Sequence, residues 1–140
     1  MLKIRVMARQ RNTHPVVPGS RRGEFLLPDQ DAIVYLNPLE RTLYRHFLNH
    51  PEGISTDALP LHRKELCRLY AHESVYDDKL LMTHKMETLC SEDKTMFYTT
   101  VSRIKKKFIA ALGARKAAPY LIKRDKTGLY KTRARLSETQ

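Results

Sequence analysis

The sequence predicts an α+β domain with a small N-terminal antiparallel sheet, a helical core and a C-terminal β-hairpin. Short apolar runs separated by turn residues come first, apolar stripes at helical spacing follow, and two strand-like segments around Asp125–Gly128 come last. With 140 residues, 41% of them apolar, the chain is long enough for one domain with a hydrophobic core. We expect this domain at 24–135, after a basic arm at 1–23 and before a tail at 136–140.

The segment before Asn37 favours strands. Leu2, Ile4 and Val6 alternate with charged residues as in a strand, whereas the prolines and glycines between positions 15 and 23 predict a mobile stretch. The apolar runs 24–27 and 32–36 are joined by a turn-forming Pro-Asp-Gln-Asp cluster. This pattern predicts a hairpin within a small antiparallel sheet.

Helix signals begin at Asn37. Asn37, Pro38 and Glu40 suit the N-cap, N1 and N3 positions of a helix that Pro51 and Gly53 bring to an end. Residues 62–90 have the apolar spacing of two more helices. A last helix starts near residues 91–93 and ends at a C-terminal glycine, with this apolar stripe: Phe97, Val101, Ile104, Phe108 and Leu112.

The net charge of the chain lies in one segment. Between Tyr98 and Arg135 there are twelve Lys or Arg and one acid, Asp125, so this segment carries +11, which is the formal net charge of the whole protein. The other 102 residues carry fourteen charges of each sign. A balanced protein with one concentrated basic segment is typical of a surface that meets a polyanion. Nucleic acid is therefore the expected partner.

The last helix carries hydroxyl groups near its start and cations further on, opposite its apolar stripe. Short polar side chains can reach base edges in the DNA major groove, and long basic ones can reach phosphates. Because a recognition helix uses its N-terminal residues on the bases, Thr99, Thr100 and Arg103 are the base-reading candidates. The phosphate candidates come from this helix and the following hairpin: Lys106, Lys107, Lys123, Arg124, Lys126, Lys131 and Arg133. For the helix alone, a merely solvated basic face is the alternative.

Three segments together resemble a known family. Residues 36–55 (LNPLERTLYRHFLNHPEGIS), 101–108 (VSRIKKKF) and 120–130, with Thr127-Gly128, occur in the order of a first helix with its turn, a recognition helix and a wing. In this order they resemble the winged helix-turn-helix DNA-binding (effector) domain of OmpR/PhoB-type response regulators, over about residues 24–135. The resemblance implies a bacterial transcription regulator whose residues 99, 100 and 103 face the major groove, while Lys106, Lys107, Lys126 and Lys131 meet phosphate or the minor groove.

The chain departs from that family in three places. We expect no receiver domain before the module, so phosphorylation control is not implied. Residues 60–90 form a longer and more helical connection than usual. In relatives this connection can contact RNA polymerase, so RNA polymerase or a regulatory protein is a further candidate partner there. The wing reads Gly128-Leu129-Tyr130 where the family usually has Gly-Tyr.

Two functions from other classes remain open alternatives. One is a protein-interaction module that uses the 60–90 helices. The other is an RNA-binding protein, although the sequence lacks the paired exposed aromatic residues that stack on bases. Because one recognition helix covers only a few base pairs, a homodimer on a repeated DNA site is also expected.

Several kinds of site are not expected. The sequence has no GxSxG, HExxH or Gly-rich phosphate motif, so we expect no enzyme and no cofactor. The spacings of Cys67, His72, His84 and Cys90 match no familiar zinc pattern, so we expect no metal site and two reduced, buried thiols. No stretch approaches the ~20 apolar residues of a membrane span, which predicts a cytoplasmic protein without a membrane partner.

Overall fold

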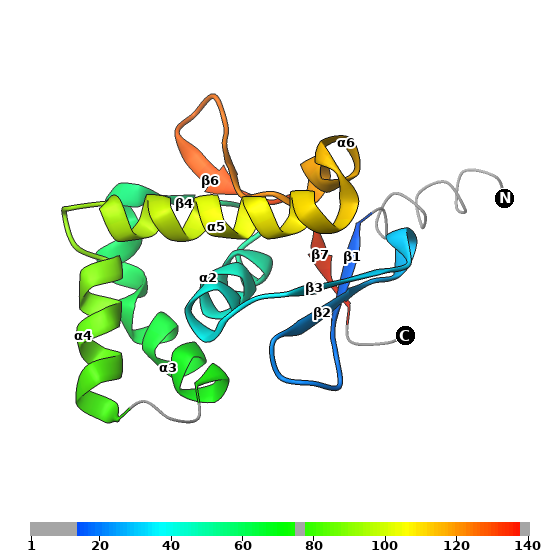
Figure 1. The fold of residues 1–140 in the computed structure, drawn as a ribbon. Helices are drawn as coiled ribbons and strands as arrows, with labels where there is room; N and C mark the ends of the chain where they lie inside the picture. Colours follow the sequence, from blue (N-terminus) through cyan, green and yellow to red (C-terminus); the bar gives the residue numbers. More distant parts are fainter. Residues whose placement is uncertain (1–13, 75–77, 138–140) are drawn as a thin grey trace, which may run out of the picture.

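The computed structural model describes residues 14–74 and 78–137 and has a mixed α+β architecture. A four-stranded sheet lies at one end of the molecule, helices α3 and α4 lie at the other, and α2 lies between them (Figure 1). The long helix α5 runs across these elements. No helix in the described ranges combines the length and apolarity that crossing a bilayer requires.

The first sheet has the strand order β3-β2-β1-β7. Strands β1 (Pro15–Pro18), β2 (Glu24–Leu27) and β3 (Ala32–Tyr35) are antiparallel, and β7 (Arg135–Leu136) pairs in parallel with β1. The hairpin predicted over 24–36 is confirmed, with η1 (Pro28–Gln30) at its turn. The predicted mobile stretch at 15–23 is wrong at its start, because buried Val16 and Val17 make β1 part of the core. The strand predicted at 2–6 lies outside the described residues.

The second sheet has the order β4-β6-β5 and is antiparallel. It joins β4 (Ile54–Ser55) to a hairpin of β5 (Lys123–Arg124) and β6 (Leu129–Lys131). The hairpin is shorter than the predicted 120–135. Residues 120–122 are buried in the core instead of pairing as a strand, and the chain after residue 132 crosses to the first sheet as β7. We call the segment Lys123–Lys131 the wing.

The predicted helices are confirmed with small shifts in their ends. They are α2 (Pro38–Asn49), α3 (Arg63–Glu73), α4 (Lys79–Leu89) and α5 (Thr95–Leu112), with η2 (Thr56–His62) before α3 and α6 (Ala114–Ala117) and η3 (Ala118–Tyr120) after α5. The capping box of α2 forms as predicted: Asn37 Oδ1 accepts from the Glu40 amide at 2.9 Å, and Glu40 Oε1 accepts from the Asn37 amide at 3.0 Å. This reciprocal cap fixes where α2 begins.

One core joins the helices to both sheets. From α5, Phe97, Ile104 and Phe108 are buried, and Val101 is partly buried. The ring of Phe108 stacks on Tyr120 with centroids 5.9 Å apart. Tyr44 in α2, whose ring also contacts Phe108, donates a hydrogen bond to the Tyr120 carbonyl at 2.7 Å. These contacts determine which side of α5 faces the core, and therefore which side faces solvent.

Candidate nucleic-acid interface

The exposed side of α5 carries two of the three predicted base-reading residues. Thr99, Arg103 and Lys106 are exposed, and their spacings of four and three place them along one strip of the helix. At 3.6 residues per turn this strip lies between Tyr98 on one side and Lys107 on the other. Arg103 has no ion pair within the described part of the chain, so its guanidinium group is available to a ligand.

Thr100 is the exception, and the prediction that it reads bases is wrong. Its side chain is buried, and the hydroxyl donates a hydrogen bond to the Met96 carbonyl one turn earlier in α5 at 2.7 Å. Three residues after buried Phe97 and four before buried Ile104, this position belongs to the core side of the helix. Neighbouring threonines therefore have different roles here.

Lys107 borders the strip and is engaged within the protein. Its ammonium group contacts Glu40 Oε1, the carboxylate that caps the N-terminus of α2. Glu40 is buried, whereas the Lys107 side chain remains 41% exposed. A lysine that neutralises a buried capping carboxylate is held for the fold, so Lys107 is a weaker phosphate candidate than its neighbour Lys106.

The wing presents its cations outward and uses its acid internally. Asp125 Oδ1 accepts from the Thr127 amide at 2.8 Å and the Leu129 amide at 3.0 Å, and its other oxygen pairs with Lys131 at 3.0 Å. The pKa of Asp125 lies far below its usual range. The hydrogen bond from the Thr127 side chain contributes most to this shift, and the hydrogen bond from Lys131 contributes next. Asp125 thus shapes the tight turn, in which Gly128 has a φ of +92°.

The predicted phosphate contacts of the wing are mostly free to meet a ligand. Lys123, Arg124 and Lys126 are exposed, whereas Lys131 is half-buried and paired with the only acid of the segment. Arg133 is also exposed and lies just after the wing. These residues form a cationic edge at and beside the hairpin.

An aromatic contact holds the wing against α5. The ring of Tyr130 in β6 lies 5.3 Å from that of Phe97 and 6.4 Å from that of Tyr98. In Figure 1 the wing projects beside the N-terminal half of α5, on the side away from α3 and α4. The wing therefore flanks the edge of α5 that carries Tyr98, next to the exposed strip.

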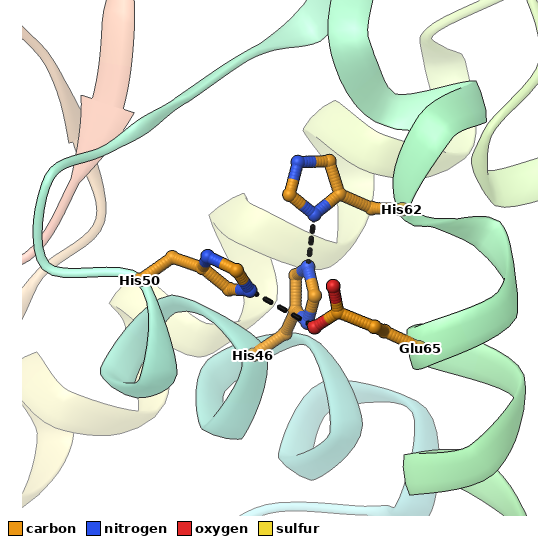
Figure 2. Close-up of side chains that lie close together, drawn as sticks. All are labelled: His46, His50, His62 and Glu65. Carbon is orange, nitrogen blue, oxygen red and sulfur yellow. Dashed lines mark hydrogen bonds and ion pairs between the residues drawn. The ribbon is translucent and has the colours of Figure 1, made fainter.

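A group of side chains of the types that can bind metals lies elsewhere, where α2 meets α3 (Figure 2). His46 and His50 come from the C-terminal end of α2, His62 from the end of η2 and Glu65 from the first turn of α3. The pKa of His46 is lowered to about 4, mainly by burial and to a smaller extent by the neighbouring His50 and His62. This ring is therefore neutral near pH 7. The sequence-based prediction of no metal site misses this group, although the i, i+4 spacing of the first two histidines is a usable signal.

The set that the sequence suggested and rejected is not brought together. Cys67, His72, His84 and Cys90 form no metal-type cluster within residues 14–74 and 78–137. Both thiols are free, Cys90 buried and Cys67 half-buried. Burial, with a smaller contribution from Cys67, raises the pKa of the Cys90 thiol to about 11, which keeps it protonated and unreactive near neutral pH.

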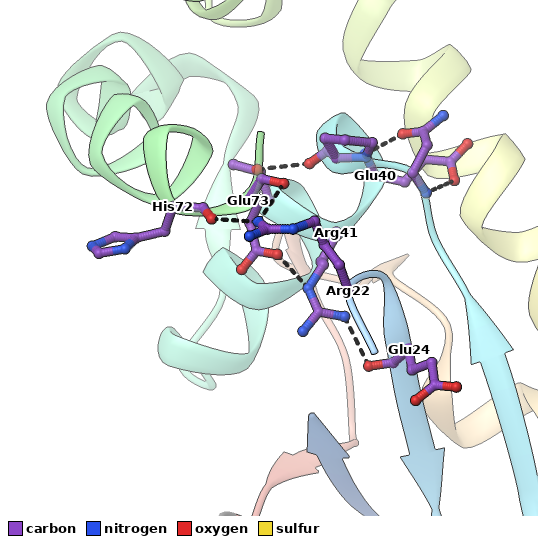
Figure 3. A network of polar contacts seen from close by, with 9 residues as sticks. Arg22, Glu24, Glu40, Arg41, His72 and Glu73 are labelled. Atoms are coloured by element: carbon purple, nitrogen blue, oxygen red, sulfur yellow. Dashed lines mark hydrogen bonds and ion pairs between the residues drawn. The ribbon is translucent and has the colours of Figure 1, made fainter. Parts of the chain in front are cut away.

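A second polar network joins α2 to β2 and to the end of α3 (Figure 3). Arg41 is buried and forms an ion pair with Glu73, while its Nη1 donates to the Glu24 carbonyl at 2.7 Å. Its guanidinium group also lies 4.5 Å from the ring centroid of Phe25. Arg22 caps the end of α3 by donating to the carbonyls of residues 72 and 73. These contacts hold the three elements together, and the burial of Arg41 withholds its charge from a polyanion.

Comparisons with protein families, curated proteins and solved structures find no match to the chain. The resemblance to OmpR/PhoB-type effector domains therefore stays a prediction that depends on the sequence motifs.

Proposed function

We propose that this protein is a non-enzymatic, DNA-binding transcription regulator with a winged helix-turn-helix arrangement. In this proposal α5 enters the major groove, where Thr99 and Arg103 read bases, and Lys106 contacts the phosphate backbone. The wing lies along the flanking backbone or minor groove through Lys123, Arg124 and Lys126. Phosphate contacts supply affinity, and base contacts supply sequence preference.

The order and pairing of the elements support this arrangement. A helix (α2) is followed by a short strand (β4), further helices, the long helix α5 and then the β5–β6 hairpin. Strand β4 pairs with β6, the second strand of the hairpin, so the sheet order is β4-β6-β5. The contact of Tyr130 with Phe97 and Tyr98 brings this hairpin next to α5, and a recognition helix with a wing requires that proximity.

The observation that carries the proposal is the contact of Tyr130 with Phe97 and Tyr98. It places the cationic wing next to an exposed strip of α5 that itself presents Arg103 and Lys106. Asp125 pairs with Lys131 inside the wing, and within the described residues no acid pairs with the other cations that face outward. Two adjacent basic surfaces, one helical and one extended, suit the groove and the flanking backbone of one duplex.

Selection of bound duplexes from a random library tests this function, followed by affinity measurement on the selected site. The expected result is an enriched motif of a few base pairs, repeated if two copies of the protein bind as a homodimer. Failure to bind any duplex, or tighter binding to single-stranded RNA of equal length, would reject the proposal.

Exposed leucines give the alternative of protein interaction a specific basis. Leu61 is 85% exposed and Leu80 is 82% exposed, and both lie in the predicted 60–90 connection. Large apolar side chains in such positions suit a partner such as RNA polymerase or a regulatory protein. Leu61→Ser and Leu80→Ser would abolish capture of such a partner while leaving binding to isolated duplex DNA unchanged.

A further inference from the structure

We propose that His46, His50, His62 and Glu65 form a binding site for one Zn²⁺-like transition-metal ion, which holds the C-terminal end of α2 against the start of α3. One ligand atom from each residue lies within 4.8 Å of the other three. This site is separate from α5 and the wing, and the inference does not depend on DNA binding.

The distances are close to those of a tetrahedral centre. Zinc bonds of about 2.0–2.2 Å place the ligand atoms of a tetrahedral site about 3.3–3.6 Å apart. Here His46 Nε2 lies 2.8 Å from His62 Nδ1, and His50 Nε2 lies 3.0 Å from Glu65 Oε2. Because one atom from each of the four side chains already lies within 4.8 Å of the others, side-chain adjustments would bring them to the distances of a tetrahedral site.

Two pairs of ligands with helical spacing face each other. His46 and His50 are four residues apart near the C-terminal end of α2, so both side chains lie on the face toward α3 (Figure 2). His62 and Glu65 are three residues apart across the junction of η2 and α3. Each pair is fixed by its own helical segment, so a metal ion would join two rigid elements.

The two ring nitrogens of His46 have different roles at this site. Nε2 faces His62 Nδ1 at 2.8 Å, a contact in which one nitrogen donates and the other accepts. A cation would replace this contact, with each ring coordinating through the nitrogen named. Nδ1 of His46 is buried, lies 3.9 Å from Glu65 Oε2 and has no hydrogen-bond partner among the described residues, so it would keep the proton when Nε2 coordinates.

The three imidazole rings also lie close together. Their centroids are 4.5 Å apart for His46 and His50, 4.9 Å for His46 and His62, and 5.0 Å for His50 and His62. Hydrogen bonds from His50 to Glu52 and Glu65 account for the position of that one ring. The hydrogen bond between His46 and His62 holds the other two rings beside it.

Glu52 supplies the supporting interaction that metal-bound histidines usually have. Its Oε2 lies 3.0 Å from His50 Nδ1, on the opposite edge of the ring from the Nε2 that faces Glu65. A carboxylate in this position fixes the ring orientation and increases the basicity of the coordinating nitrogen. The chain thus provides four ligands and an outer carboxylate.

The donor set selects the class of metal. Three imidazole nitrogens and one carboxylate oxygen suit zinc and its neighbours among the divalent transition metals, whereas Mg²⁺ and Ca²⁺ prefer oxygen ligands. With four protein ligands the site has the closed coordination of a structural zinc centre. We therefore assign it a structural role between α2 and α3.

Calorimetric titration of the untagged full chain with Zn²⁺ and then Co²⁺ is the first test. The expected result is one equivalent of each ion bound and the intense visible absorption of tetrahedral cobalt, with no binding of Mg²⁺. Absence of Zn²⁺ binding, or the weak cobalt spectrum of six-coordinate oxygen ligation, would overturn the proposal.

Matched variants locate the bound ion. His50→Gln and Glu65→Gln each remove one ligand from a partly exposed position, and each should weaken Zn²⁺ binding at least about 100-fold, since outer carboxylates alone contribute 10–100-fold. His84→Gln, an exposed histidine of α4, should bind like the wild type. Circular dichroism confirms that all variants fold. Equal Zn²⁺ affinity in all three variants would place the ion elsewhere and reject this site.

Thermal unfolding tests the structural role separately. Zn²⁺ at one hundred times its Kd should raise the Tm of the wild type by about 5–10 °C, because the ion binds the folded state in preference to the unfolded chain. The same Zn²⁺ concentration should leave the Tm of His50→Gln unchanged. Zn²⁺ binding by the wild type without a rise in Tm would contradict the role of holding α2 against α3.

Discussion

Arg41 in α2 and Arg103 in α5 carry the same guanidinium group in opposite surroundings. Arg41 is buried, ion-paired with Glu73 and hydrogen-bonded to the Glu24 carbonyl. Arg103 is exposed and has no ion pair in the described part of the chain. The first arginine stabilises the junction of α2, β2 and α3. The second is free to bind something outside the protein.

The same difference separates the two regions as wholes. Around α2 and α3, buried charged side chains meet partners within the fold, as with Arg41 and Glu73. Along α5 and the wing, most cations face solvent, whereas Lys107 and Lys131 pair with acids. Sequence charge alone locates the basic segment at 98–135, but it does not say which cations of that segment the fold pairs, as it pairs Lys107 and Lys131. Four predictions test the distinction, from the largest expected effect to the smallest.

Replacing Arg41 should cause the largest loss of stability. Arg41→Ala leaves Glu73 charged, buried and without its cation, so the free energy of unfolding should fall by about 3–5 kcal/mol in urea denaturation. The paired replacement Arg41→Met with Glu73→Leu should recover much of this loss. If Arg41→Ala kept full stability but lost DNA affinity, the assignment of the α2–α3 region to the fold would be wrong.

Replacing Arg103 should act on binding and leave stability alone. Arg103→Ala should weaken binding to the selected duplex by about 1–3 kcal/mol and relax sequence preference, as measured by fluorescence anisotropy on cognate and scrambled sites. Lys126→Ala should weaken both duplexes alike. Arg68→Ala, an exposed arginine of α3, is the matched control and should change neither affinity. An equal loss on cognate and scrambled DNA for Arg103→Ala would remove its base-reading role.

The neighbouring threonines of α5 provide a narrower test. Thr99→Val removes an exposed hydroxyl and should cost about 1 kcal/mol of affinity on the selected duplex. Thr100→Val removes a hydroxyl that bonds within the helix, and it should leave that affinity unchanged and shift the free energy of unfolding by about 1 kcal/mol or less. The reverse pattern of affinities would mean that a different side of α5 meets DNA.

The neighbouring lysines should differ in the same way, with smaller effects. Lys106→Gln should reduce the salt dependence of duplex binding by about 0.9 in log–log slope, because one phosphate contact is lost. Lys107→Gln should reduce the free energy of unfolding by about 1 kcal/mol or less, since its partly exposed pair with Glu40 is screened by solvent. If Lys107→Gln instead reduced the log–log salt slope of duplex binding by about one and left stability unchanged, the pairing of Lys107 with Glu40 would be contradicted.

Local signals in the sequence predicted much of the fold. Asn37, Pro38 and Glu40 marked the start of α2 because a cap depends on adjacent residues, and the stripe of α5 placed Ile104 and Phe108 in the core. Pairing between distant segments could not be predicted. The prolines at both ends of β1 argued against a strand there, and the parallel pairing of β1 with β7 joins the two ends of the described chain. No local pattern encodes such a partner.

The candidate sites divide in a similar way. Exposure of Arg103 and Lys106 followed from helical periodicity, and the same periodicity, applied to Thr100, would have placed it on the core side. The partners of the charged residues could not be predicted, because Lys107 and Glu40 are 67 positions apart. The histidine cluster needed the packing of α2 on α3, although the spacing of His46 and His50 was visible beforehand.

The salt dependence of binding to a random-sequence duplex tests the central claim most directly, because it counts phosphate contacts without knowledge of the target. For the wild type, the logarithm of the affinity should fall linearly with the logarithm of the salt concentration. The variant with Lys123, Arg124 and Lys126 all changed to alanine should have a slope smaller by about 2–3. A control with Lys64→Ala and Arg68→Ala on α3 should keep the wild-type slope. An unchanged slope in the wing variant, or an equal decrease in the control, would contradict a DNA-binding surface formed by α5 and the wing.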